Sequence, residues 1–329
     1  MERYAGYAVA DCHSDALLPV VGQSLVPGET GKRDFFARNV IGHMDLPRLE
    51  AGHVACQAFA CFAGESIPPE GAKAVTDMLL DSLDAILAQA GPRMRRILSA
   101  ADAEAARRDG TVGALATIEG GECLEGDLAL LGHFHGRGVR MLGLTHNKRN
   151  ELGRGAKAEG TDGLSDFGKA VIRECARLGV VVDVSHLSDQ ALDDALKTTD
   201  APLVASHSNC RALCCHVRNL RDDQIIDIGR TGGLVAATCV PYFVERQKGM
   251  ANLGRLADHI ERVARLAGIE HVALGSDFEG YDPSYGATVP DAAGWPLLAD
   301  ELERRGFSRG EVDRVFWGNW LAVFKSVAG

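Results

Sequence analysis

Seven side chains that could bind metal or move protons follow short apolar runs, which we interpret as the ends of buried strands. They are His13, Asp15, Glu119, His146, His186, His207 and Asp277. Imidazole nitrogens and carboxylate oxygens are common protein ligands of divalent metals. Carboxylates buried together lose solvation and repel one another, and bound metal ions offset both costs. The pattern therefore predicts a metal centre, and a closely spaced metal pair is a frequent hydrolytic device.

The first of these motifs, V-A-D-C-H-S-D, places His13 and Asp15 two positions apart. In an extended chain they point to the same side, as two ligands of one ion must. Cys12 points to the opposite side, so we interpret it as a core residue rather than a thiolate ligand.

The potential ligands at the strand ends are sufficient to bind two Zn²⁺ ions. His13 and Asp15 would bind one ion, His186 and His207 the other, and Glu119 could bridge both. The groups expected to orient the imidazoles are Asp183 and the hydroxyls of Ser185 and Ser206.

The other histidines fit ordinary structural roles better. His133 and His135 lie two positions apart in a predicted helix, where such residues diverge, so we expect both at the surface. The rest lie in predicted loops, in helices or at the start of a strand: His43, His53, His216, His259 and His271.

Eight apolar runs alternate with helical patterns, which predicts a parallel sheet. Closed on itself, the sheet is an α/β fold, a (β/α)8 TIM barrel, with its chemistry at the carboxyl ends of the strands. A doubly wound open sheet is the alternative, but it predicts a glycine-rich phosphate turn, and Gly120-Gly121 follows a carboxylate instead. The predicted strands are 7–10, 54–62, 113–118, 139–144, 180–184, 202–205, 233–238 and 272–274. The predicted helices include 45–51, 71–89, 100–108, 124–134, 167–178, 189–197, 253–267, 295–305 and 308–326.

The composition limits the partners. The chain has 329 residues and is 46% hydrophobic, which suits one barrel domain over 1–329. Its formal net charge of -10 disfavours nucleic acid or an anionic membrane as a partner. We expect a cytoplasmic protein, since no signal peptide or transmembrane segment is visible and the nine cysteines are scattered. The long loop over 23–38 could be a lid.

The ordered motifs resemble the membrane (renal) dipeptidase family of zinc peptidases. They are D-C-H-S-D, T-I-E-G-G, L-T-H-N-x-x-N, D-V-S-H, A-S-H-S-N, R-N and G-S-D-F-E-G, followed by G-N-W-L-A-V-F at the end of the chain. The resemblance covers nearly the whole chain. It implies an amidohydrolase-like barrel with a binuclear zinc centre, in a cytoplasmic bacterial-type member. Cys12 and Ser14 depart from the more usual Gly and Asn of the first motif, which puts local packing and substrate preference in doubt.

The resemblance also implies roles for single residues. The zinc ligands would be His13 and Asp15 for one ion, His186 and His207 for the other, and Glu119 as the bridge. A second group would act on the substrate: His146 on the peptide and the tetrahedral intermediate, Arg218 with Asn219 on the substrate carboxylate, and Asp277 as the carboxylate beside the bridging water.

We therefore expect a zinc-dependent dipeptidase that uses a metal-bridging hydroxide, with Asp277, His146 and Glu119 as the catalytic residues. Its substrate would be a dipeptide with a free carboxylate, and a D-residue could be accepted at the carboxyl-terminal side. Two alternatives stay open: another amidohydrolase-type reaction on a lactam, a cyclic amide or an N-acyl amino acid, and an inactive metal-binding or scaffold protein. A homodimer is only what the resemblance implies.

Overall fold

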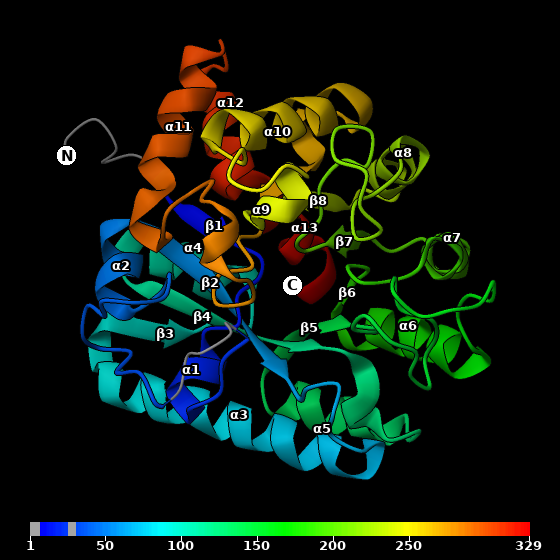
Figure 1. Cartoon of the computed structure of the whole chain (residues 1–329). Helices are drawn as coiled ribbons and strands as arrows, with labels where there is room; N and C mark the ends of the chain where they lie inside the picture. The colour runs from blue at the N-terminus through cyan, green and yellow to red at the C-terminus, as the bar shows by residue number, and fades with distance from the viewer. Residues whose placement is uncertain (1–6, 26–30) are drawn as a thin grey trace.

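A closed barrel of eight parallel strands forms the centre of the molecule (Figure 1). The computed structural model describes residues 7–25 and 31–329, which contain nine strands. They pair in the order β2-β1-β9-β8-β7-β6-β5-β4-β3, and a further pairing of β2 with β4 closes the barrel and leaves β3 as a short addition on β4. The strands are β1 Val9–Asp11, β2 Val54–Phe62, β3 Met94–Arg96, β4 Val112–Glu119, β5 Val139–Gly143, β6 Val181–Asp183, β7 Leu203–Ala205, β8 Leu234–Ala237 and β9 Val272–Leu274.

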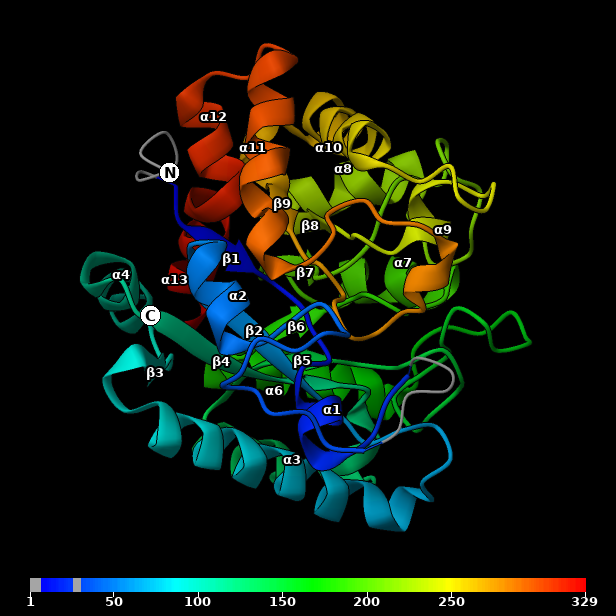
Figure 2. The same ribbon diagram turned by 60° about the vertical axis from the view of Figure 1, so that its left-hand side comes forward.

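Helices surround this barrel (Figures 1 and 2). Several begin at a side-chain cap, as the sequence predicts: Asp45 accepts a hydrogen bond from the Arg48 amide at the start of α2, and Ser188 accepts one from Ala191 at the start of α7. The helices are α1 Leu17–Val21, α2 Leu46–Ala51, α3 Pro69–Ala90, α4 Ala100–Asp109, α5 Ala129–Gly136, α6 Asp166–Leu178, α7 Asp189–Thr198, α8 Asp222–Arg230, α9 Pro241–Val244, α10 Leu253–Ala267, α11 Trp295–Arg304, α12 Arg309–Asp313 and α13 Asn319–Ala328.

Successive side chains of the strands belong alternately to two hydrophobic clusters, a smaller and a larger one. Residues such as Ala10, Leu115 and Met141 belong to the smaller cluster, which also includes Trp320 and Phe324 of α13. Their sequence neighbours belong to the larger cluster, which packs the strands against the outer helices. Figure 1 shows α13 behind the centre of the barrel. Helix α13 packs on the smaller cluster. The polar groups follow the last residues of the strands and therefore gather at the carboxyl ends of the barrel.

Some predicted elements differ from the structure. The helix predicted over 124–134 is wrong at its start: Gly121–Leu124 is a short 3-10 turn and α5 begins only at Ala129. Glu125 and Gly126 between them have φ of 46° and 72°, left-handed values that a right-handed helix cannot contain.

The closing helix predicted over 308–326 is divided. A π turn, Arg314–Gly318, separates α12 from α13. Strand β3 was not predicted, because its sequence Met-Arg-Arg carries no apolar run. Of the predicted lid loop over 23–38, residues 26–30 lie outside the described part of the chain.

No helix among the described residues has the length and apolar character needed to span a bilayer.

Candidate metal centre and active site

Three imidazoles converge on one carboxylate at the carboxyl end of the barrel. Glu119, the last residue of β4, has its Oε1 atom 3.7 Å from His13 Nε2, 2.9 Å from His186 Nε2 and 3.8 Å from His207 Nε2. Asp15 joins them, with Oδ2 3.9 Å from His13 Nε2. The histidines follow β1, β6 and β7, so barrel closure brings together residues that lie far apart in the sequence.

Hydrogen bonds at the Nδ1 atoms leave Nε2 free as a ligand in two of these histidines. Asp183 accepts from Ser206 Oγ at 2.5 Å, so this hydroxyl accepts in turn from His207 Nδ1 at 2.8 Å. His186 Nδ1 lies 3.3 Å from Asn147 Oδ1, to which it donates. The two Nε2 atoms lie 2.8 Å apart, and with Nδ1 as the donor of each ring both present a lone pair to the centre, as metal ligands require. The predicted orienting role of Asp183 and Ser206 agrees with these contacts.

A second buried aspartate makes the corresponding contacts at the first strand. Asp11 accepts from the Ser276 amide at 2.8 Å and from Ser276 Oγ at 2.6 Å, which joins the end of β1 to the end of β9. It also accepts from the His13 amide at 3.3 Å. The sequence reasoning missed Asp11, although its position two residues before His13 matches that of Asp183 before Ser185.

Burial and mutual repulsion shape the protonation of the acids. Desolvation, followed by the charge of Asp277, raises the pKa of Asp15 well above its usual range. Desolvation and the charge of Asp15 do the same to the pKa of Glu119, and desolvation raises the pKa of Asp277 to about 7. Burial lowers the pKa of His13 to about 3. The centre thus contains imidazoles that stay neutral and acids that resist ionisation, and bound metal ions would supply the positive charge that favours the ionised carboxylates.

The donor set fits a pair of divalent ions. His13 Nε2 and Asp15 Oδ1 are buried without a hydrogen-bond partner. Two groups of potential ligand atoms, each within 4.8 Å of one another, share Glu119: His13 with Asp15, and His186 with His207. A third such group joins His13, His207 and Asp277. Orphaned buried polar atoms are costly in a folded protein, and bound cations would satisfy them.

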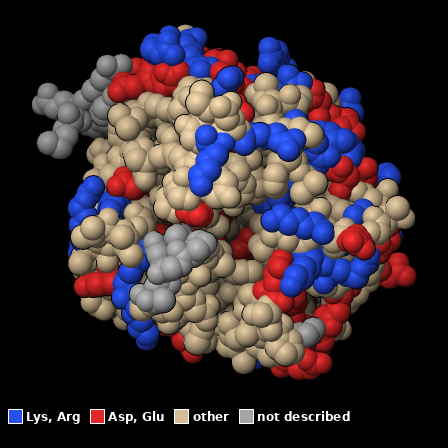
Figure 3. All heavy atoms as spheres, viewed as in Figure 1, with Lys and Arg blue, Asp and Glu red and all other residues tan. Residues whose placement is uncertain are grey.

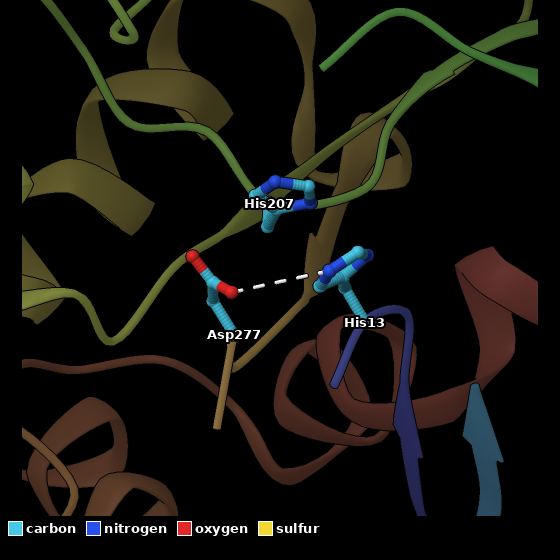
Figure 4. Close-up of side chains that lie close together, drawn as sticks. All are labelled: His13, His207 and Asp277. Atoms are coloured by element: carbon cyan, nitrogen blue, oxygen red, sulfur yellow. Dashed lines mark ion pairs between the residues drawn. The ribbon is translucent and has the colours of Figure 1, made fainter. Parts of the chain in front are cut away.

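Asp277 faces the same centre from the end of β9. Its Oδ1 lies 3.9 Å from His13 Nε2, and Figure 4 shows His13, His207 and Asp277 pointing toward one another from separate strand ends. Asp277 and His186 both have left-handed backbones, with φ of 61° and 69°. Such backbone conformations in non-glycine residues store strain of about 1–3 kcal/mol each and are frequent at functional sites.

His146 lies beside the centre rather than in it. Its ring is 4.3 Å from that of His186 and 4.5 Å from that of Phe62, measured between centroids. Its Nδ1 lies 2.5 Å from Oε1 of Glu65, and this hydrogen bond lowers the pKa of Glu65 to about 2. Glu65 was missed, although it follows strand β2 by three residues, the same kind of position that identified the other acids.

Arg218 is a buried cation on which the charges of Asp277 and Glu119 act, although neither carboxylate forms a salt bridge with it. Only 3% of its surface is exposed, its Nη2 atom has no hydrogen-bond partner, and its guanidinium lies over the Phe243 ring at 5.5 Å. No described residue forms a salt bridge with it. A buried, unpaired guanidinium is costly unless a ligand supplies the negative charge.

Asn219, predicted to act beside Arg218 on the substrate carboxylate, is instead hydrogen-bonded to its own loop and to α9. It is fully buried, its amide donates to the carbonyls of Cys214 and Phe243 at 2.8 and 2.7 Å, and its Oδ1 accepts from the Asn209 amide. Both of its donors are used, so its contacts do not support direct substrate binding. They hold the loop that carries Arg218.

One cavity joins most of the predicted residues. It is lined by Asp15, Glu119, His146, His186, Arg218 and Asp277, and also by Lys157 and Tyr242, which sequence reasoning did not single out. Figure 3 shows this face of the molecule: acidic atoms lie in a hollow near its centre, with lysine and arginine side chains beside it.

The remaining sequence interpretations agree with the structure in most respects. Cys12 is fully buried in the smaller core cluster. His133 is exposed on α5 and bonded to Asp77, and His135 is half-buried. His43 and His259 are buried among other residues, outside the metal centre.

Comparison with known proteins identifies the family. The family model described as membrane dipeptidase, peptidase family M19, matches residues 5–329. The chain is 32% identical over 307 residues to an uncharacterised dipeptidase of Schizosaccharomyces pombe, covering 88% of this chain and 73% of that protein.

Two solved structures agree. A metallopeptidase of family M19, dipeptidase AC, superimposes with a TM-score of 0.87 at 27% identity, over 98% of this chain and 99% of the other. A metallopeptidase from Rhodobacter sphaeroides, bound to a phosphinate mimic of the dipeptide L-Ala-D-Ala, superimposes with a TM-score of 0.87 at 26% identity over the same shares. The chain belongs to the membrane dipeptidase family, peptidase family M19, and is a hydrolase of the metallo-dipeptidase type.

Proposed function

We propose that this protein is a zinc dipeptidase that hydrolyses dipeptides with a free carboxyl terminus, including those with a D-residue at that end. Support for the D-residue comes from the Rhodobacter sphaeroides metallopeptidase, which was solved with a mimic of L-Ala-D-Ala.

The ligands we assign are His13 and Asp15 to one ion and His186 and His207 to the other, with Glu119 shared between them. Two bound Zn²⁺ ions would lower the pKa of an attacking water and polarise the peptide carbonyl. The chain contributes the neutral imidazoles and the carboxylates that hold the pair, and it excludes bulk water from the ring of buried groups.

Asp277 is the group we assign to proton transfer. It lines the substrate cavity, and although it forms a third group of potential ligand atoms with His13 and His207, the two groups that share Glu119 are complete without it. A carboxylate there can accept a proton from the attacking water and deliver it to the nitrogen of the leaving amine, without which the amine does not depart.

His146 is assigned to the carbonyl oxygen of the scissile bond. The hydrogen bond from Nδ1 to Glu65 orients the ring, and Asn147 Nδ2 lies 3.1 Å from its Nε2. Burial lowers the pKa of His146 despite the contact with Glu65, so the free ring is neutral and would donate from Nε2 only after it takes up a proton, which the negative charge that develops on this oxygen would favour. Asn219 takes the indirect role of holding the Arg218 loop.

The environment of Arg218 is the single observation that supports a substrate with a free carboxylate. Its guanidinium is buried, is unpaired and lines the same cavity as the metal-ligand groups. A planar fork of donors matches a carboxylate with two parallel hydrogen bonds. A dipeptide offers this carboxylate close to its scissile bond, whereas a lactam without a carboxylate does not.

The test compares free-acid and amidated dipeptides. Wild-type protein should favour the free acid, and Arg218→Met should remove this preference while lowering kcat/KM for the acid by about 2–4 kcal/mol of transition-state stabilisation. Arg230→Met is the control, because Arg230 is an exposed arginine of α8, outside the Arg218 loop, that is paired with Asp227 at 2.6 Å. If Arg218→Met keeps the wild-type ratio of acid to amide, the assignment is wrong.

The identity of the metal as zinc, the homodimer and the cytoplasmic location stay predictions. Metal analysis, sedimentation and fractionation of the native protein would test them in turn.

A further inference from the structure

A groove lies next to the active-site cavity, on the side of β1 and β2. It has a volume of about 580 Å³ and shares His146 and Leu25 with the cavity. Its apolar lining includes Leu18 in α1, Phe62 at the end of β2 and Ile67 in the loop that follows.

The polar groups of this groove are already neutralised. Glu65 Oε1 is bonded to His146, and Glu65 Oε2 lies 3.5 Å from Lys148 Nζ. The groove therefore offers no unpaired charge to a ligand, and apart from the uncharged polar residues Gln23, Ser24 and Ser66 the rest of its lining is mainly apolar.

The order of the strands in the barrel indicates which end of a bound dipeptide lies beside this groove. Arg218 belongs to the loop after β7, and β7 lies diametrically opposite β2 in the closed order of the eight strands. If Arg218 binds the carboxylate of a dipeptide, the scissile carbonyl lies over the metal ligands. The two residues of an extended dipeptide span about 7 Å. Its amino-terminal residue then lies on the β2 side, beside His146.

We propose that this groove binds the side chain of the amino-terminal residue, and that the preferred substrates carry a large apolar residue there, such as phenylalanine or leucine. The inference rests on the proposed dipeptidase function and adds the substrate class. A groove of 580 Å³ is far larger than the methyl group of alanine requires. Burial of an aromatic or branched side chain against Leu18, Phe62 and Ile67 would stabilise the bound substrate through the hydrophobic effect.

The experiment uses the zinc-loaded full chain and three substrates that differ only in the amino-terminal residue: L-Phe-D-Ala, L-Leu-D-Ala and L-Ala-D-Ala. We expect kcat/KM for the phenylalanine and leucine substrates to exceed that for the alanine substrate by at least about tenfold. Ile67→Asp places a charge in the groove and should lower the ratio of phenylalanine to alanine substrate at least about fivefold. Ile67 is 37% exposed, so this change should not prevent folding.

Two further variants make the result interpretable. Ile67→Ala only shortens the side chain and should lower the same ratio by a smaller factor. Leu297→Asp changes a half-exposed leucine of α11 outside the groove and should keep the wild-type ratio.

A wild-type ratio near one, or an Ile67→Asp variant with the wild-type ratio, would overturn the groove assignment and leave the dipeptidase proposal standing. Hydrolysis of none of the three substrates, nor of any other dipeptide, would remove the proposed function and this inference with it.

Discussion

At the scale of single residues, the site depends on which nitrogen or oxygen of each side chain is left free. His207 and His186 each donate from Nδ1, to Ser206 and to Asn147, so their Nε2 atoms face Glu119 as acceptors. Asp277 faces the same centre but belongs to neither of the ligand groups that share Glu119. Its carboxylate also lies within ligand distance of His13 and His207, so the proposed mechanism assigns it proton transfer because the two groups that share Glu119 are complete without it.

Replacing Asp277 by Asn tests this assignment. The variant should retain both metals and bind substrate, but lose about 10²–10⁴-fold in kcat, because an amide cannot carry the proton to the leaving nitrogen. Metal content, substrate affinity and turnover are the measurements. Asp282→Asn, in the same loop but at the surface, is the matched control and should be active. Loss of zinc from the Asp277 variant would show that Asp277 is a ligand, and near-normal turnover with both metals bound would exclude it from catalysis.

At the scale of elements, two buried aspartates join neighbouring strand ends. Asp183 accepts from the amides of Ser185 and Ser206 at 2.9 and 3.0 Å, and Asp11 makes the corresponding bonds between β1 and β9. These contacts fix the two positions from which His207 and His13 enter the centre. The strand ends are therefore held by hydrogen bonds before any metal binds.

Removal of one of these acceptors should affect both folding and metal binding. Asp183→Ala leaves two buried amides and one hydroxyl without their acceptor, so the free energy of unfolding of the metal-free protein should fall by about 2–4 kcal/mol in urea. Zinc affinity should fall about 10–100-fold, since the orientation of His207 is lost. Asp166→Ala, an exposed acid at the start of α6, is the control and should leave the unfolding midpoint unchanged. An equal response of the two variants would contradict the role given to Asp183.

The elements also show what the sequence could and could not predict. All eight barrel strands were predictable, since each is an apolar run and most end in a residue capable of binding metal. Strand β3 was not, because its Arg95 and Arg96 are half-buried edge residues without a period-2 pattern. Lys157 was missed because it enters the site from a long loop, and loop geometry depends on tertiary contacts that no local pattern reports. Glu65 follows β2 by three residues, so its position after a strand was the one signal that could have identified it.

At the scale of the whole molecule, the buried charge of the site couples metal binding to pH. The pKa of Asp15 and Glu119 is raised well above the usual range, and that of Asp277 to about 7, in each case chiefly by desolvation. A carboxyl group with a raised pKa in the folded state stabilises the fold below its unfolded pKa, near 4, and this stability is lost as the pH rises through the folded pKa. The metal-free protein should therefore lose part of its stability between about pH 4 and pH 7 or above.

This coupling predicts the effect of a chelator. Metal binds the ionised carboxylates and neutral imidazoles, both of which are more abundant at pH 8 than at pH 5. The difference in Tm between zinc-loaded and chelated protein should therefore be larger at pH 8 than at pH 5, as measured by calorimetry. Burial also lowers the pKa of His13 to about 3, so protonation of its imidazole in the unfolded chain, at pH values below about 6.5, destabilises the fold at acid pH with or without metal. A Tm difference that is equal at the two pH values, or larger at pH 5, would contradict the coupling.

The most direct measurement follows activity and bound metal together. The protein is stripped with a chelator, zinc is added back in steps, and the rate of L-Ala-D-Ala hydrolysis is recorded at each measured zinc content. Two ions on ligand groups that share Glu119 predict negligible activity in the stripped protein and a rate that rises until two zinc ions are bound per chain. Full activity in stripped protein without detectable metal, or saturation of the rate at a single bound ion, would contradict a catalytic metal pair.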